Sequence, residues 1–228
     1  MDRLAESIAL EVLEAEAVRG QRFSLLSEEI GRRDFGSDYP LVLLDPIDGS
    51  LNAKQGIPVY AVMASLLDGP TVGDVRAGHV INLVSGETWT AIRGSGAWRN
   101  DVALRPLISE HPGRIDLVGL ESSPRSLELA ANLVRNAGKI RILGSMALSI
   151  AHAAAGGFDV FCSPLDARVF DMTASALVLR EVGGVLTDIA GKSLDGVEVG
   201  FHSRSTLLAA SDPAMHALAL GHLAWAGD

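Results

Sequence analysis

The chain has 228 residues, 48% hydrophobic and 21% charged, which is enough apolar material for one large domain or two small ones. Its 28 acidic residues exceed its 19 basic residues, giving a formal net charge of −9. Because no run of lysine and arginine occurs, nucleic acid and anionic membranes are not expected as partners. Cys162 is the one cysteine, which excludes an internal disulfide, and no apolar stretch has the length of a membrane span. We therefore expect a cytoplasmic protein.

The first half is predicted to consist mainly of strands. Apolar residues at helical spacing predict a helix over the first segment (Leu4, Ile8, Val12, Leu13). Strands are predicted at 23–30, 41–44 and 58–67, followed by a hairpin of 75–84 and 88–93 around Ser85-Gly86-Glu87. The polar segment 31–39 is predicted as a loop and 94–100 as a cluster of turns.

Strands and helices alternate in the second half, which predicts an α/β arrangement. The expected strands are 114–120, 140–143, 158–161, 185–189 and 206–210. The expected helices are 124–136, 146–155, 171–182 and a last one from about 213. The loop near residue 112 is the predicted boundary between an N-terminal α+β metal-binding domain, 1–112, and a C-terminal α/β domain, 113–228.

The most informative local feature is Asp45-Pro-Ile-Asp-Gly-Ser50, which follows the apolar run 41–44. In a continuing strand, Asp45 and Asp48 would point to opposite faces because side chains alternate with a period of two. Pro46 cannot donate a ladder hydrogen bond, so we expect the chain to turn and both carboxylates to converge. Carboxylates are the oxygen ligands that Mg²⁺ prefers, and the carbonyl of Ile47 is a further candidate ligand.

A short helix that begins at Gly49-Ser50 would direct free N–H groups toward an anion. Carboxylates for cations next to N–H groups for phosphate predict a site for phosphoryl transfer. Two carboxylates this close repel each other, so one would tend to stay protonated, and a divalent cation removes that conflict.

Two other acidic segments are candidates to complete the site. Glu28-Glu29 closes the strand that precedes the Asp45 strand, so it can reach the same end of the sheet; Glu29 is interpreted as a solvated or salt-bridged neighbour of Glu28. Asp171 opens the predicted helix 171–182, where aspartate is typical as an N-cap. The alternative role is ligand of a second metal, and composition alone favours the cap.

These segments resemble the inositol monophosphatase / fructose-1,6-bisphosphatase superfamily. The resemblance is carried by Ser27-Glu-Glu, Asp45-Pro-Ile-Asp-Gly-Ser-Leu-Asn, Gly144-Ser-Met-Ala-Leu, Gly156-Gly-Phe-Asp and Phe170-Asp-Met-Thr-Ala, and it runs in order from Asp2 to about Asp188. It implies an α/β layered fold, an αβαβα sandwich with an antiparallel N-terminal sheet and a smaller C-terminal α/β sheet.

The resemblance also implies residue roles. Two or three Mg²⁺ ions would be bound by Glu28, Asp45, the carbonyl of Ile47, Asp48 and Asp171, which makes ligand the favoured role of Asp171. Ser50 and Asp2, the latter in Asp2-Arg-Leu-Ala-Glu6, would orient the attacking water. The substrate would contact Asp48, Gly49, Ser50, Gly144, Ser145, Met146, Arg168 and Asp171. The Arg168-x-x-Asp171 pattern resembles the archaeal and bacterial members that also accept fructose bisphosphate. For Arg168, contact with a second phosphate and pairing with a carboxylate are both open.

The implied reaction is Mg²⁺-dependent hydrolysis of a phosphomonoester by metal-activated water, without a covalent intermediate. Inositol monophosphate and fructose 1,6-bisphosphate are the implied substrates, both small phosphorylated polyols or sugars; Li⁺ inhibition and a homodimer are also implied. An aspartyl-phosphate mechanism is not supported, because it needs two aspartates two residues apart.

The N-terminus departs from the family pattern. Family members have two helices and a flexible catalytic loop before the segment that matches Asp2 to Glu6. The expected consequence is exposed apolar surface. The alternative function is therefore a shortened, weakly active or inactive member that acts as a binding or regulatory subunit.

Overall fold

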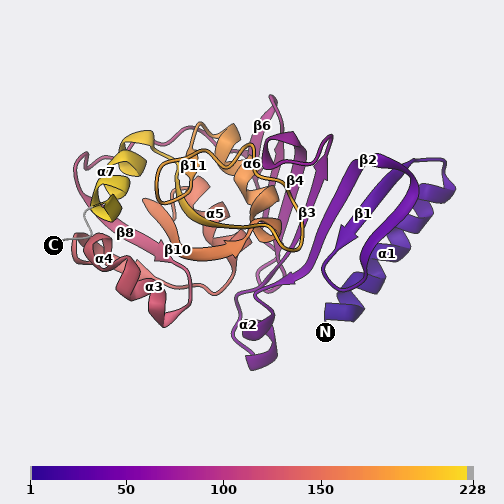
Figure 1. The fold of residues 1–228 in the computed structure, drawn as a ribbon, viewed down its shortest axis with the longest axis horizontal. Helices are drawn as coiled ribbons and strands as arrows, with labels where there is room; N and C mark the ends of the chain where they lie inside the picture. The colour runs from indigo at the N-terminus through magenta and orange to yellow at the C-terminus, as the bar shows by residue number, and fades with distance from the viewer. Residues whose placement is uncertain (1, 225–228) are drawn as a thin grey trace.

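A computed structural model describes residues 2–224, with side chains from residue 4 to 223. Its larger sheet has seven antiparallel strands in sequence order (Figure 1). They are β1 (Phe23–Ser27), β2 (Gly31–Asp48), β3 (Ala61–Leu67), β4 (Val75–Asn82), β5 (Thr88–Ile92), β6 (Gly96–Arg99) and β7 (Val102–Ala103).

The smaller sheet has five strands in the order β11-β12-β10-β8-β9. β10 runs parallel to β8 and antiparallel to β12, so this sheet is mixed. Its strands are β8 (Ile115–Leu120), β9 (Ala137–Arg141), β10 (Val160–Arg168), β11 (Val185–Thr187) and β12 (Arg204–Ala210). The predicted antiparallel first sheet and smaller second sheet are both confirmed.

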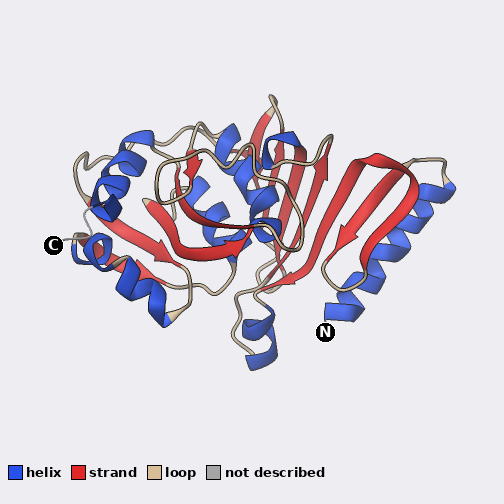
Figure 2. Ribbon diagram, viewed as in Figure 1, coloured by secondary structure: helices blue, strands red, loops and turns tan. Residues whose placement is uncertain are grey.

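Helices complete a layered αβαβα sandwich, as predicted (Figure 2). α1 (Asp2–Val18) packs against β2, while α5 (Met146–Ala154) and α6 (Thr173–Glu181) lie between the two sheets. The far side of the smaller sheet carries α3 (Pro124–Leu129), α4 (Ala131–Arg135) and α7 (Pro213–Ala224). A Cβ at Gly78 of β4 would lie 2.8 Å from the Cα of Ala174, so α6 can approach the larger sheet this closely only because position 78 is glycine.

The long β2 corrects the prediction of a loop at 31–39. β1 pairs with β2 on both of its edges: Leu25 lies opposite Arg33 on one side and Val42 on the other. The first part of β2 is therefore an edge strand whose polar side chains are largely exposed. Its composition resembles that of a loop because solvent covers it, while β1 supplies the ladder hydrogen bonds. The predicted turns at 94–100 likewise contain a short strand, β6.

The remaining elements follow the prediction with local differences. The hairpin of β4 and β5 is confirmed. The predicted helix 124–136 is divided at Ala130 into α3 and α4. The predicted helix 171–182 begins as a 3₁₀ turn, η2 (Val169–Met172), before α6 starts. The first helix is confirmed, but its apolar residues Leu4, Ile8 and Val12 are 67%, 58% and 61% exposed, in agreement with the expected apolar surface.

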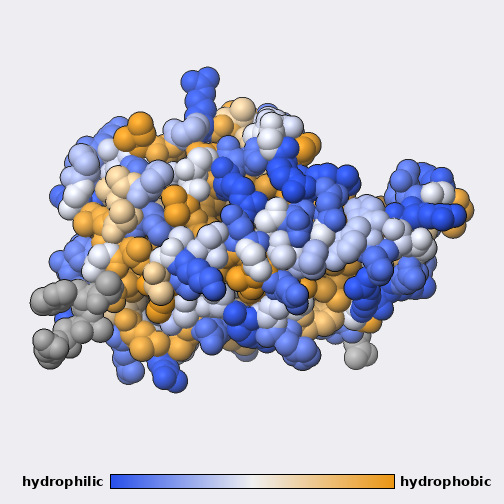
Figure 3. All heavy atoms as spheres, turned by 45° about the horizontal axis from the view of Figure 1, so that its top comes forward, coloured by the Kyte–Doolittle hydropathy of each residue, from blue (hydrophilic) through white to orange (hydrophobic). Residues whose placement is uncertain are grey.

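One hydrophobic cluster joins the larger sheet, α5, α6 and part of the smaller sheet. The predicted boundary near 112 falls in the segment between β7 and β8, and the division into two domains stays a prediction. On the face shown in Figure 3, hydrophilic residues separate small apolar patches. Within residues 2–224, no helix has the length and apolarity needed to cross a membrane.

Candidate active site

The Asp45–Ser50 segment leaves the sheet through an irregularity in the ladder. Asp45 lies opposite Met63 and Asp48 lies opposite Ala61, so β2 has two residues where β3 has one. This is a bulge at Pro46 and Ile47, where proline removes a donor. The bulge breaks the strict alternation of side chains, and both aspartates are buried, with 0% and 7% exposure. The predicted turn at the proline is confirmed in this form.

Gly49 links the bulge to α2 (Ser50–Gln55), the predicted short helix. Its φ is +90°, and a Cβ there would lie 3.1 Å from the carbonyl oxygens of Gly144 and Val59. Asn52 in α2 donates from Nδ2 to the carbonyls of Val59, at 2.8 Å, and Leu143, at 2.7 Å. Asn52 thus stabilises the turn, as interpreted from the sequence, and ties α2 to the segment that precedes α5.

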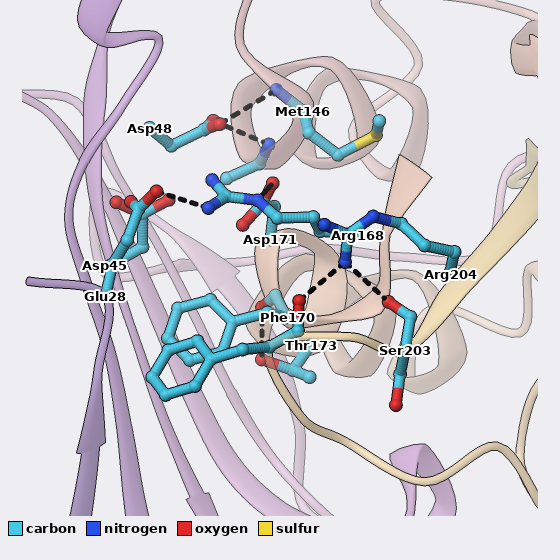
Figure 4. A network of polar contacts seen from close by, with 12 residues as sticks. Glu28, Asp45, Asp48, Met146, Arg168, Phe170, Asp171, Thr173, Ser203 and Arg204 are labelled. Atoms are coloured by element: carbon cyan, nitrogen blue, oxygen red, sulfur yellow. Dashed lines mark hydrogen bonds and ion pairs between the residues drawn. The ribbon is translucent and has the colours of Figure 1, made fainter. Parts of the chain in front are cut away.

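Asp48 is held at the N-terminus of α5 (Figure 4). Its carboxylate accepts hydrogen bonds from the Oγ of Ser145, from the N–H of Met146 at 3.2 Å and from the N–H of Ala147 at 2.8 Å. Burial raises the pKa of Asp48, and these hydrogen bonds lower it in part. The carboxylate therefore positions the Gly144-Ser145-Met146 segment that the sequence assigned to the substrate.

Arg168 stands at the centre of the acidic residues. Its Nη1 donates to Oε1 of Glu28, which follows β1, and its Nε donates to Oδ2 of Asp171 in η2 at 2.8 Å. Of the two roles left open for Arg168, the structure shows pairing with carboxylates. Asp171 precedes α6, whose N-cap is Met172, so the structure contradicts the capping role that composition favoured.

The buried carboxylates are electrostatically unfavourable by themselves. Burial raises the pKa of Asp45 well above its usual range, and the charges of Asp48, Asp171 and Glu28 raise it further. Burial also raises the pKa of Asp171 to about 7, against the lowering effect of Arg168. In the described part of the chain, Oδ2 of Asp45 and Oδ1 of Asp171 are buried without a hydrogen-bond partner. Such oxygens favour a proton or a cation.

The donor set fits the chemistry of a hard cation, because it consists of carboxylate oxygens. Three of these carboxylates make hydrogen bonds with other elements of the protein. Asp48 accepts from the start of α5, while Glu28 and Asp171 accept from Arg168. Among the side chains described, from residue 4 to 223, no three Asp, Glu, His or Cys groups converge in a way that could hold a metal ion. The structure thus brings the predicted ligands into one region without converging them on one point.

The two residues predicted to orient the attacking water, Ser50 and Asp2, are only partly described. Ser50 is the first residue of α2 and is half-buried. Asp2 begins α1, and its side chain lies outside the described residues. Glu6, one helical turn later, is 2% exposed. Its Oε1 accepts hydrogen bonds from the Oγ of Ser27 and from the N–H groups of Glu29, at 3.3 Å, and Ile30, at 3.1 Å.

A pocket of about 340 Å³ opens beside Asp48, Arg168 and Asp171. It contains six of the eight predicted substrate contacts: Asp48, Gly144, Ser145, Met146, Arg168 and Asp171. Gly49 and Ser50 are not part of its lining. Its lining also includes residues that the sequence did not single out, among them Glu121, Ser122 and Asp166.

Known proteins resemble this chain over nearly its whole length. Residues 1–225 match the inositol monophosphatase family. The chain belongs to this family. A fructose-1,6-bisphosphatase/inositol-1-monophosphatase of Methanothermobacter thermautotrophicus is 32% identical over 227 residues, which are 95% of this chain and 79% of that protein. An inositol-1-monophosphatase of Mesorhizobium japonicum is 34% identical over 201 residues, 83% of this chain and 71% of that one.

A solved structure agrees with the fold. The extragenic suppressor protein suhB from Bartonella henselae superimposes with a TM-score of 0.80 and 29% identity, covering 97% of this chain and 82% of that chain. The predicted family and its αβαβα sandwich are confirmed. Membership of the inositol monophosphatase family also confirms the predicted enzyme class, a phosphoric monoester hydrolase. The homodimer and the cytoplasmic location stay predictions.

Two residues next to the predicted site, Glu6 and Glu121, had no role predicted from the sequence. Glu6 was part of the Asp2 segment, and its position one turn from Asp2 on the same helix was the available signal. Glu121 had no comparable signal, because it lies in no recognisable motif. Its place in the pocket follows only from the parallel pairing of β8 with β10.

Proposed function

We propose that this protein hydrolyses the phosphomonoester of a small polyol or sugar, inositol monophosphate or fructose 1,6-bisphosphate, in a Mg²⁺-dependent reaction with direct attack of water. The observation that carries the proposal is a pair of aspartates: Asp45, which is fully buried, and Asp171, whose side chain is 13% exposed and lines the pocket. Both have a raised pKa, and each has one buried oxygen without a partner among the described residues. Carboxylates in this condition are suited to bind cations.

The residues that would hold two or three Mg²⁺ ions are Glu28, Asp45, the carbonyl of Ile47, Asp48 and Asp171. Bound Mg²⁺ supplies positive charge for the phosphoryl oxygens and lowers the pKa of water. Repulsion among the carboxylates supports this assignment, because every cation that enters the cluster removes part of the cost of burying them. Ile47 itself is 4% exposed, in the middle of the bulge.

The chain's own groups would orient the reactants. Gly49 and Ser50 begin α2, whose first N–H groups have no partner within the helix and suit a phosphate. The hydroxyl of Ser50 and the carboxylate of Asp2 would direct the water. Asp48 fixes the start of α5, so Gly144, Ser145 and Met146 keep a constant position on the pocket wall.

Arg168 would bind the phosphate at the same end of the pocket. Its guanidinium now neutralises Glu28 and Asp171. When cations neutralise these carboxylates, the guanidinium becomes available to the anionic substrate. In this view Arg168 exchanges carboxylates for phosphate, and no proton transfer is asked of it, because arginine remains protonated.

The proposal is tested by measuring phosphate release from inositol 1-phosphate and fructose 1,6-bisphosphate with and without Mg²⁺. We expect turnover that requires Mg²⁺ and falls at least about a hundredfold in Asp45→Asn, because that change removes a charged ligand. Asp101→Asn is the matched control, because Asp101 is exposed and its φ of 63° suits asparagine. Turnover that persists in a chelator would contradict the mechanism.

The alternative is a family member that binds metal weakly and serves as a binding or regulatory subunit. One observation favours it: the predicted ligands, as far as the structure describes them, do not converge on one point. This alternative expects no phosphate release from either substrate at saturating Mg²⁺. It also expects a smaller increase in melting temperature at a given Mg²⁺ concentration than a phosphatase that binds the ion tightly would show.

A further inference from the structure

The pocket has two chemically different ends, joined by β10. At one end are Arg168 and Asp171, with the candidate metal ligands. At the other end, the N–H of Glu121 donates to the carbonyl of Cys162 at 3.1 Å, which places the end of β8 beside the start of β10. From Ser163 to Arg168 the strand spans five residues, at most about 16 Å. A substrate whose phosphate lies near Arg168 therefore directs its other end toward Glu121.

Glu121 is fixed in place by the residues that follow it. Its Oε1 accepts a hydrogen bond from the Oγ of Ser122 at 2.8 Å. Its Oε2 accepts from the N–H of Ser123 at 2.9 Å and from the Oγ of Ser126 at 3.4 Å. Burial of Glu121 raises its pKa, but these hydrogen bonds outweigh it and hold the pKa below the usual value. The carboxylate is thus held as an anion on the pocket wall.

The same hydrogen bonds occupy the donors that a phosphate would need at this end. Hydroxyl and backbone N–H groups before a helix are common phosphate ligands. Here the hydroxyls of Ser122 and Ser126 and the N–H of Ser123 all point to Glu121. A second phosphate would therefore meet a fixed negative charge and would find these donors already in use.

The charges of the pocket lining agree with this picture. Four acidic residues line it, Asp48, Glu121, Asp166 and Asp171. Among its described lining residues, Arg168 is the one basic side chain, and it lies at the other end, paired with Glu28 and Asp171. Cations bound by the site would neutralise Asp48 and Asp171 but would leave Glu121 and Asp166 charged.

We propose that Glu121 makes this pocket selective for a polyol that carries a single phosphate, and that it disfavours a second phosphate at the distal end. Three of the roughly four lone-pair sites of the Glu121 carboxylate accept the hydrogen bonds named above, so at most one polyol hydroxyl can donate to it, whereas a phosphate dianion has no proton to donate. The proposal rests on the proposed phosphatase function for its substrate class, and it chooses between the two substrates named there.

The test is a binding titration in Mg²⁺ buffer with non-hydrolysable probes, the phosphonate analogue of a hexitol 1-phosphate and the bisphosphonate analogue of a hexitol 1,6-bisphosphate. Wild-type protein is expected to bind the monophosphonate at least about tenfold more tightly. Glu121→Gln is expected to reduce this preference about tenfold, mainly through tighter binding of the bisphosphonate. Glu128→Gln is the control, because Glu128 is exposed on α3 and changes the net charge equally.

Equal binding of both probes by wild-type protein overturns the proposal, as does the same preference in Glu121→Gln and Glu128→Gln. Thermal melting of Glu121→Gln checks that it is folded, since glutamine keeps one acceptor oxygen for Ser123. The titration does not depend on turnover. Absence of phosphate release together with the expected binding preference would remove the proposed function and leave the selectivity of the pocket standing.

Discussion

The Nε of Arg168 donates a hydrogen bond of 2.8 Å to Oδ2 of Asp171, three residues further along the chain. The same guanidinium reaches Glu28, 140 residues earlier in the sequence. One cation therefore joins a turn of the larger sheet to the 3₁₀ turn that precedes α6. These two carboxylates are also proposed metal ligands, so Arg168 and Mg²⁺ are expected to compete for them.

Replacing Arg168 by glutamine should destabilise the protein without divalent ions and strengthen its response to Mg²⁺. Loss of the cation leaves Glu28 and Asp171 unpaired, at an expected cost of about 1–3 kcal/mol, below that of a fully buried pair because these groups keep some exposure. Because the guanidinium no longer competes with Mg²⁺ for the two carboxylates, Mg²⁺ should raise the melting temperature of the variant more than that of the wild type. Denaturant unfolding and thermal melting measure both effects.

Arg180→Gln is the matched control, because the Arg180 side chain is 32% exposed, like that of Arg168. Arg180 pairs with Asp195, which is not one of the proposed metal ligands. Its response to Mg²⁺ should equal that of wild type. An identical Mg²⁺ response in Arg168→Gln and Arg180→Gln would show that Arg168 does not compete with the metal.

Asp171 should make stability depend on pH in a chelating buffer. Its pKa is about 7 in the folded protein, against 3.8 for an ordinary aspartate, so the folded state binds more protons between these values. Its stabilising contribution is therefore complete below about pH 4 and is lost as the pH rises through about 7. At about 1.36 kcal/mol per pKa unit, the upper bound is about 4 kcal/mol. Denaturant unfolding at pH 4 to 8 measures it.

Asp171→Asn provides the comparison, since it keeps the shape of the side chain and cannot titrate. The difference between the two stability profiles should shrink as the pH falls from 8 to 4. The pKa of Asp45 is raised partly by the charge of Asp171, so Asp45 contributes with the same sign in both proteins but less in Asp171→Asn, and the difference reports the coupled pair. Parallel profiles would refute a raised pKa for Asp171.

Glu6→Ala should weaken Mg²⁺ binding by releasing the turn that carries Glu28. Glu6 accepts hydrogen bonds from Ser27, Glu29 and Ile30, on both sides of Glu28. Their loss leaves the buried hydroxyl of Ser27 without its acceptor, which costs about 1–3 kcal/mol of stability. Isothermal titration with Mg²⁺ should show an affinity about tenfold lower than wild type.

Glu6→Gln keeps an acceptor oxygen for the turn and should recover most of the Mg²⁺ affinity that Glu6→Ala loses. Glu11→Gln on the exposed face of α1 controls for the loss of charge. Wild-type Mg²⁺ affinity in Glu6→Ala would exclude a positioning role.

Gly49→Ala should be markedly more destabilising than Gly86→Ala. Both glycines have positive φ, +90° and +74°, so both alanines carry the backbone penalty of about 1 kcal/mol or more. Only at Gly49 would the new Cβ lie 3.1 Å from two carbonyl oxygens, whereas nothing lies within 4 Å at Gly86. We expect an excess of about 1–2 kcal/mol for Gly49→Ala by denaturant unfolding. Equal losses would show that the contact with the Gly144 segment relaxes freely.

Local chemistry explains what could be predicted. Pro46 and Gly49 impose the turn after Asp45 through their own backbone restrictions, so this turn was visible in the sequence. Gly156 ends α5 in the same local way, with a φ of +77°. The segment 31–39 was predicted as a loop because its residues are polar. They are polar because the edge of the sheet is exposed to solvent, and the strand forms because the segment pairs with β1. Asp171 was placed too close to α6 because a 3₁₀ turn and a helix N-cap favour the same residue types.

The sequence alone determined the family, the layered fold and the acidic segments of the site, because short-range turns and hydrophobic periodicity are encoded within a few neighbouring residues. Only the tertiary structure decided which groups those acids contact. Arg168 lies between Glu28 and Asp171, and Glu121 faces the same pocket, because strands distant in the chain pair side by side. Which charged groups interact depends on their distance in space. For residues on different helices and strands, that distance cannot be read from their separation in the sequence.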